Sequence, residues 1–178
     1  MYITTNHKIH FTPLEPKQEQ IIIEDIAHAQ SLMTRANGHF PEFYSVAQHS
    51  IACAREAIAR GYTKRVALAC LLHDGSEAYL SDITRPVKQV LSEYREIEKR
   101  VQDAIYIRFL GELPTQEESR QIDDIDNTCL YYEFDHYMGE KLFPEKPTCE
   151  SQMIFRFRPF KEVEREFLEL FGELTGEE

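Results

Sequence analysis

Residues 66–74 read Val-Ala-Leu-Ala-Cys-Leu-Leu-His-Asp, an unbroken apolar run that ends on a histidine and an aspartate. Such a run predicts a segment that is buried in the core of the fold. Burying His73 and Asp74 without partners would cost several kcal/mol. The sequence therefore predicts a compensating group at the end of this segment, and a divalent metal ion is the best candidate.

The segments around this run have helical spacing of their apolar residues. Ser45 and Thr63 are predicted N-caps, and Gly61 and Gly111 are predicted to end helices. A loop is expected over 81–88, between two of the helices. The expected helices cover about 24–35, 46–60, 64–79, 91–109, 114–138 and 159–172.

The first residues predict a different kind of structure. Pro13 and Pro16 interrupt short extended pieces, so a small β-hairpin or irregular arm is expected over about 1–20. The core is expected over about 21–140, followed by an irregular stretch and the C-terminal helix. A chain of 178 residues fits one domain, 1–178. The fold class that follows is all-α, a bundle of about six helices with a small N-terminal β element.

Composition limits the function classes. The net charge is −11, and no stretch supplies the basic stripe that a nucleic-acid polymer would need. A small anionic substrate stays possible, since a few local cations or a metal ion can overcome the overall field. The four cysteines form no C-x-x-C pair, and we find neither a signal peptide nor a run of transmembrane length. We therefore expect a cytoplasmic protein with reduced thiols and no membrane partner.

Two further residues are predicted to face the histidine–aspartate pair. His49 lies on an apolar helical stripe with Val46 and Cys53, so its ring is directed inward. Asp126 lies in a second apolar stripe, whereas Asp124 projects to the opposite face of that helix and is expected to be solvated. Asp123 lies at the edge of the stripe and is the rival ligand. The predicted metal ligands are His49, His73, Asp74 and Asp126.

Two imidazoles and two carboxylates form a mixed nitrogen and oxygen site. Such a set suits Mn²⁺, Co²⁺, Fe²⁺, Ni²⁺ or Zn²⁺ better than Ca²⁺ or a dedicated Mg²⁺ cage. The alternative from the residues alone is a buried hydrogen-bonded pair, His73 with Asp74, and an ordinary core histidine at position 49. The pattern by itself leaves these two interpretations open.

The spacing of these ligands resembles a known family. His49, then His73-Asp74, then Asp126 are similar to the H…HD…D pattern of the HD-domain metal-dependent phosphohydrolases. The run 73–82, His-Asp-Gly-Ser-Glu-Ala-Tyr-Leu-Ser-Asp, resembles the HD-x-x-E-x-x-x-x-D run of the 5′-deoxynucleotidase branch. The resemblance implies that the four residues hold a divalent metal ion.

Other segments extend the resemblance to roughly residues 20–140. Residues 43–50, Phe-Tyr-Ser-Val-Ala-Gln-His-Ser, resemble the entry into the first ligand helix of phage-type members. Pro-Val-Lys at 86–88 follows the second motif as it does in the nucleotidase branch, and Asp126 with Glu133 matches the D-x6-E spacing around the last ligand.

The resemblance implies an all-α, often dimeric phosphomonoesterase that acts on deoxyribonucleoside 5′-monophosphates. The arginine of the first helix in that branch matches Arg35 in this chain, and the acids beside its metal ligands match Glu77 and Asp82. Two departures concern the substrate. Ala36 stands where that branch has a tryptophan against the sugar, and Thr84 stands where it favours proline. Discrimination between deoxyribose and ribose is therefore expected to be weaker here.

Chemistry suggests a role for each candidate side chain. Glu77 could orient or deprotonate a water molecule or protonate the leaving oxygen, and its alternative is a surface carboxylate. Asp82 could accept a sugar hydroxyl or merely cap a turn. Arg35 is the best phosphate clamp, because a guanidinium binds phosphate through two hydrogen bonds. The remaining substrate-binding candidates are His39, Arg85 and Lys88.

The sequence thus predicts a metal-dependent phosphohydrolase for small nucleotides, with nucleoside 5′-monophosphates as the expected substrates and Glu77 and Asp82 as catalytic residues. One alternative is hydrolysis of nucleoside di- or triphosphates, or of another nucleotide pyrophosphate bond, at the same site. Another is a nucleotide-sensing protein that keeps the site without turnover. A homodimer is the expected assembly.

Overall fold

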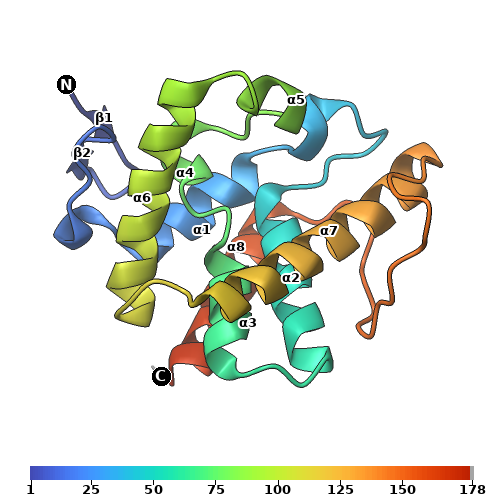
Figure 1. The fold of residues 1–178 in the computed structure, drawn as a ribbon. Helices are drawn as coiled ribbons and strands as arrows, with labels where there is room; N and C mark the ends of the chain where they lie inside the picture. Colours follow the sequence, from blue (N-terminus) through green and yellow to red (C-terminus); the bar gives the residue numbers. More distant parts are fainter. Residues whose placement is uncertain (177–178) are drawn as a thin grey trace.

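The computed structural model describes residues 1–176, which form a bundle of helices with a two-stranded antiparallel sheet near the N-terminus (Figure 1). Six α-helices of this region have nine residues or more, so the predicted all-α class with a small β element is confirmed. The elements are β1 (Ile3–Thr4), β2 (His10–Phe11), η1 (Gln18–Gln20), α1 (Ile23–Leu32), η2 (Arg35–Gly38), α2 (Val46–Ala59), α3 (Lys64–Leu72), α4 (Glu77–Leu80), α5 (Arg85–Lys88), α6 (Ser92–Leu110), α7 (Gln116–Met138) and α8 (Phe160–Thr175), where η marks a 3₁₀ helix.

Local sequence determines where three of the long helices begin. Ser45 caps α2, and its hydroxyl accepts a hydrogen bond from the backbone N–H of Gln48, whose side chain accepts one from Ser45 in return. Thr63 caps α3 in the predicted place by accepting from the N–H of Val66. A second reciprocal cap at Thr115 starts α7, one residue after the predicted opening.

The apolar run of α3 is the centre of the core. All seven residues from Val66 to Leu72 are buried, and α3 contacts α2, α6, α7 and α8. The C-terminal helix α8 covers this core with Val163, Phe167 and Phe171, as its spacing predicts, while Phe160 at its start is exposed. Burial on every side explains why α3 carries no polar residue between its first turn and His73.

Two helix ends differ from the predictions. The helix expected to reach Arg35 ends at Leu32, because the chain continues in extended form and pairs with the entry into α2. The N–H of Arg35 donates to the carbonyl of Tyr44 over 2.8 Å, which places Arg35 in η2. Helix α3 ends at Leu72, so Glu77 does not continue it but begins α4.

The segment expected to be a loop contains α5. Pro86 lies in the first turn of α5, where its fixed φ and its missing N–H are both tolerated. Within residues 1–176, none of the helices is both long and apolar enough to cross a bilayer.

Candidate metal centre

Four side chains from three separate elements converge on one point. His49 comes from α2, His73 and Asp74 follow α3, and Asp126 comes from α7. Nε2 of His49 lies 3.2 Å from Nε2 of His73 and 3.1 Å from Oδ1 of Asp126. Oδ2 of Asp74 lies 3.3 Å from Nε2 of His73 and 3.8 Å from Nε2 of His49. The structure therefore brings together all four residues that the sequence predicts as ligands.

Hydrogen bonds on the far side of each ring determine which nitrogen faces this point. Nδ1 of His49 lies 2.6 Å from Oε1 of Glu133, and Nδ1 of His73 lies 2.8 Å from the carbonyl oxygen of Cys70. A carboxylate and a carbonyl can only accept, so each Nδ1 carries the proton and donates it. Both Nε2 atoms are then left as acceptors that point toward each other and toward two carboxylates.

This donor set fits a divalent metal ion. Metal–ligand distances of about 2.1 Å separate neighbouring ligands by about 3.0 Å in an octahedron and about 3.4 Å in a tetrahedron. The two Nε2 atoms lie 3.1–3.8 Å from each other and from the carboxylate oxygens of Asp74 and Asp126. Acceptor atoms this close repel one another unless a cation lies between them. The partners on Nδ1 are of the kind that orient metal-binding histidines.

The electrostatics of the site agree with this assignment. Burial lowers the pKa of His73, but the carboxylates of Asp74 and Asp126 raise it above its usual value. Burial raises the pKa of Asp126, but the neighbouring imidazoles of His49 and His73 hold it well below its usual value. The centre thus carries negative charge that favours a bound cation.

Other donors near the centre are less suitable. Sγ of Cys53 lies 3.5 Å from Nε2 of His49, so His49, Cys53 and His73 form a second possible ligand group. Burial raises the pKa of Cys53 well above its usual value, which disfavours the thiolate that a metal needs. Asp124 is 64% exposed and pairs with Arg60, as its predicted outward direction requires, and Asp123 is also exposed.

Arg35 lies beside the metal ligands rather than free in the pocket. Its Nη1 lies 3.5 Å from Oδ2 of Asp74, and its Nη2 lies 3.3 Å from Oε2 of Glu133. Burial lowers the pKa of Arg35, but Glu133, Asp74 and Asp126 raise it well above the usual value, so it stays charged. The guanidinium therefore balances the acids of the centre and also reaches the pocket wall.

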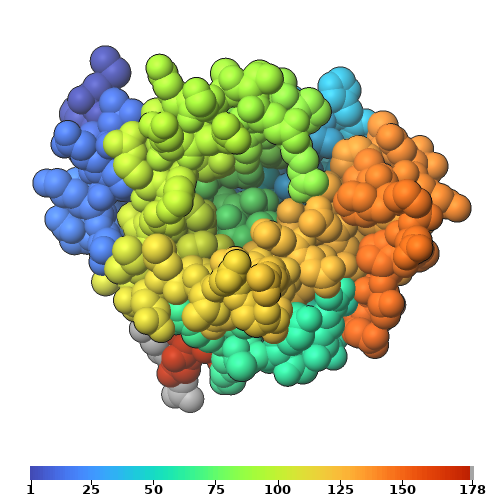
Figure 2. Space-filling view, viewed as in Figure 1, coloured from blue at the N-terminus to red at the C-terminus, as the bar shows by residue number. Residues whose placement is uncertain are grey.

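A cavity of about 740 Å³ opens above the centre. Figure 2 shows it as a hollow between α5, α6 and α7, with residues near the end of α3 and α4 at its floor. The predicted substrate and catalytic residues all line it, together with two of the ligands. These residues are Arg35, His39, Asp74, Glu77, Asp82, Arg85, Lys88 and Asp126.

Glu77 is a buried carboxylic acid at the edge of the cavity, not the surface carboxylate of the alternative interpretation. It is only 4% exposed, and its Oε2 has no hydrogen-bond partner among the described residues. Burial, together with the nearby charges of Asp74 and Asp82, raises its pKa well above the usual value. The pKa of Asp82 is also raised, chiefly by burial. A carboxyl group with a raised pKa is suited to act as a general acid.

The cations of α5 also line the cavity. Nη2 of Arg85 lies 3.4 Å from Oδ2 of Asp126, and this side chain is 55% exposed. Nζ of Lys88 lies 2.6 Å from Oε1 of Glu98 and 3.6 Å from Oε1 of Glu77. Both side chains have further N–H groups that can donate hydrogen bonds to an anion in the cavity.

Three polar residues of the site were not among the predicted site residues. Glu133 orients His49, Glu98 holds Lys88, and Gln30 donates from Nε2 to the carbonyl of Asp74 over 2.7 Å. Only Glu133 had a signal in the sequence, the spacing of seven residues from Asp126 on one helix face. The other two come from helices whose packing against the site is a tertiary property.

Comparison with known proteins gives relatives without an assigned activity. No family model matches the chain. It is 36% identical over 104 residues to the uncharacterized protein YfdR of Escherichia coli (strain K12), and the aligned residues cover 58% of this chain and 55% of that protein. It is 40% identical over 102 residues to the uncharacterized protein RCAP_rcc00048 of Rhodobacter capsulatus, and the aligned residues cover 54% of this chain and 52% of that protein. The chain thus matches about half the length of each of these curated relatives.

Proposed function

We propose that this chain is a metal-dependent phosphohydrolase that removes phosphate from nucleoside 5′-monophosphates. The observation that carries the proposal is the group of four converging side chains, His49, His73, Asp74 and Asp126, at the floor of a cavity whose walls carry cations and a buried acid. The resemblance to HD-domain phosphohydrolases supports the same reaction class. A homodimer and a cytoplasmic location stay predictions from the sequence.

The ligands His49, His73, Asp74 and Asp126 would hold the cation. A divalent cation there would acidify a water molecule and neutralise charge on a phosphoryl group. Glu133 contributes by orienting the ring of His49 through the 2.6 Å hydrogen bond to Nδ1. These contacts pre-arrange the donor atoms, so little reorganisation accompanies metal binding.

Hydrolysis breaks the bond between phosphorus and the ester oxygen, and that oxygen must gain a proton. Glu77 is suited to supply it, since its carboxyl group lines the cavity and burial raises its pKa well above the usual value. A positioned general acid typically contributes about 10²–10⁴-fold to the rate. Arg85 and Lys88 compensate charge on the phosphate oxygens, and Asp82 is placed to accept a hydroxyl of the sugar.

The test is phosphate release from a panel of nucleoside mono-, di- and triphosphates, measured on metal-stripped protein before and after adding Mn²⁺, Co²⁺, Ni²⁺, Fe²⁺ or Zn²⁺. The proposal expects metal-dependent release from monophosphates. Release of phosphate or pyrophosphate from di- or triphosphates alone would instead identify the alternative, a hydrolase of nucleoside di- or triphosphates. Nucleotide binding without release from any member of the panel would identify a sensing protein.

A further inference from the structure

The cavity has two chemically different ends. Helix α7 lines it with Asp126, Leu130 and Phe134, which lie four residues apart and therefore on one face of the helix. At 1.5 Å per residue, the wall runs from the carboxylate to the aromatic ring over about 12 Å. A ligand of about this length whose charged group lies near Asp126 can therefore reach Phe134 with its far end.

A second segment of the cavity wall also changes from charged to aromatic residues. Segment η2 and the residue pair after it contribute Arg35, Ala36 and Phe40. Arg35 contacts Asp74 at the metal centre, while the ring of Phe40 lies edge-on to Phe134 with centroids 5.3 Å apart. Both segments thus go from charged to aromatic, and they meet at the rings of Phe40 and Phe134.

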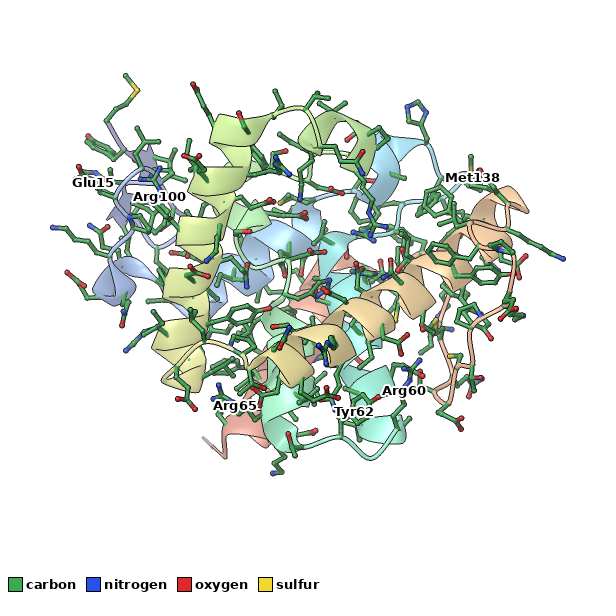
Figure 3. The ribbon with its side chains drawn as sticks, in the orientation of Figure 1. Glu15, Arg60, Tyr62, Arg65, Arg100 and Met138 are labelled. Atoms are coloured by element: carbon green, nitrogen blue, oxygen red, sulfur yellow. The ribbon has the colours of Figure 1, made fainter. Side chains whose placement is uncertain are left out.

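A third segment closes the aromatic end. Gly139 ends α7, whose last residue Met138 is labelled in Figure 3, and Phe143 enters the cavity lining from the irregular chain that follows. That chain is fastened to α2, because Glu56 accepts hydrogen bonds from the N–H groups of Glu150 and Ser151. The segment that carries Phe143 is therefore held against the helices by hydrogen bonds.

From this polarity we infer that the aromatic end binds the planar heteroaromatic base of the nucleotide. The inference rests on the proposed function. The charged end fits a phosphate. The part of the wall with Ala36 and Leu130 leaves room for a pentose, and a base stacks favourably on aromatic rings. Among the described residues of these walls beyond Arg35 and Asp126, His39 is the one polar side chain. Binding at this end therefore depends on stacking more than on hydrogen bonds to particular base atoms.

Two substitutions and a matched control test the inference. Phe134→Leu and Phe143→Ala remove rings from the aromatic end, and Phe157→Ala removes an exposed ring from the same irregular chain. We expect either cavity variant to raise KM for adenosine 5′-monophosphate about 10-fold or more. The same variants should change kcat/KM for glycerol 2-phosphate, which has no ring, by less than about 2-fold. Phe157→Ala should change neither value.

Base tolerance is the second measurement. Because the wall recognises a ring face, kcat/KM should differ by less than about 10-fold among the four common bases, whereas a hydrogen-bonding site can discriminate by about 10⁴-fold. Equal losses for adenosine monophosphate and glycerol phosphate in the cavity variants would overturn the inference. So would a strict preference for one base.

A binding measurement separates this inference from the proposed function. Adenosine, which has no phosphate, is titrated into metal-free protein, and chemical shifts are followed by NMR. The inference expects saturable shifts that weaken in Phe134→Leu but not in Phe157→Ala. If that result accompanies no phosphate release from any substrate, the base subsite stands and the proposed function fails. Binding of adenosine that is equal in all variants would refute the subsite whatever the enzyme hydrolyses.

Discussion

Replacing Glu133 by glutamine should weaken metal binding although Glu133 touches no substrate. Its carboxylate is fully buried, lies 2.6 Å from Nδ1 of His49 and makes the ligand nitrogen on the other side of that ring more basic. Glutamine keeps the shape and one acceptor oxygen but removes the charge. Losing such an orienting partner typically weakens metal affinity about 10–100-fold, which is about 1.4–2.7 kcal/mol.

The same substitution should lower the stability of the metal-free protein. Arg35 loses the ion pair of 3.3 Å between its Nη2 and Glu133 and keeps the one of 3.5 Å between its Nη1 and Asp74. Removing one partner of a buried pair can cost about 3–5 kcal/mol, and the remaining carboxylate reduces this to about 1–3 kcal/mol. Urea unfolding of stripped protein measures this loss separately from metal binding.

Isothermal titration of stripped protein with Mn²⁺, Co²⁺ and Zn²⁺ gives the affinities. Asp124→Asn is the matched control, since Asp124 lies on the same helix, carries the same charge and is exposed. It should bind each metal as the wild type does. A folded Glu133→Gln protein whose Kd values stay within about 2-fold of the wild type would refute the argument that Glu133 prepares His49 for a metal ion.

Other substitutions address catalysis, acid stability and backbone strain. Glu77→Gln should retain metal but lower kcat about 10²-fold or more in the phosphate-release assay, because an amide cannot donate the proton as an acid does. Hydrogen bonds from Ser151, Glu150 and Arg60 outweigh burial and lower the pKa of Glu56 from 4.5 to about 2. That stabilisation, about 3 kcal/mol, is present above pH 4.5 and is lost as the pH falls toward 2, so urea unfolding of Glu56→Gln should depend less on pH in this range. Ala36 has φ of 51°, so Ala36→Gly should raise the free energy of unfolding by about 0.5–1 kcal/mol in the same assay.

The features that could be predicted are those that depend on neighbours in the sequence. The start of α2 follows from Ser45 with Gln48 three residues later, which is a local pattern of two hydrogen bonds. The inward direction of His49 and Asp126 follows from the helical period, because apolar residues on the same stripe show which face is buried. These local arguments were enough to predict that the two side chains face the core, and the structure brings both of them close to His73 and Asp74. That the four residues hold a metal ion stays a prediction, which the family resemblance supports.

Features that depend on tertiary contacts could not be predicted. Ala36 and Asn37 both have positive φ without being glycine, and the extended pairing of Thr34 with Ser45 stabilises that turn from outside it. This is why the prediction that the helix reaches Arg35 was wrong. Gly75 is a similar case, because a Cβ there would lie 2.9 Å from the carbonyl oxygen of Leu72. A Cβ would also lie 3.1 Å from Cδ1 of Ile105 in α6, and this second approach is a tertiary contact that no local pattern reveals.

The most direct test of a metal centre at these ligands is the metal content of purified variants. Asp126→Ala and His73→Ala each remove a donor atom that lies within 3.3 Å of another ligand, whereas Asp124→Ala removes an exposed carboxylate on the same helix as Asp126. After saturation with Mn²⁺ or Zn²⁺ and removal of free ions, elemental analysis should find about one ion per chain in the wild type and in Asp124→Ala, and a small fraction of that in the two ligand variants. Full metal content in folded Asp126→Ala, or loss of metal in Asp124→Ala, would contradict the assignment of the centre.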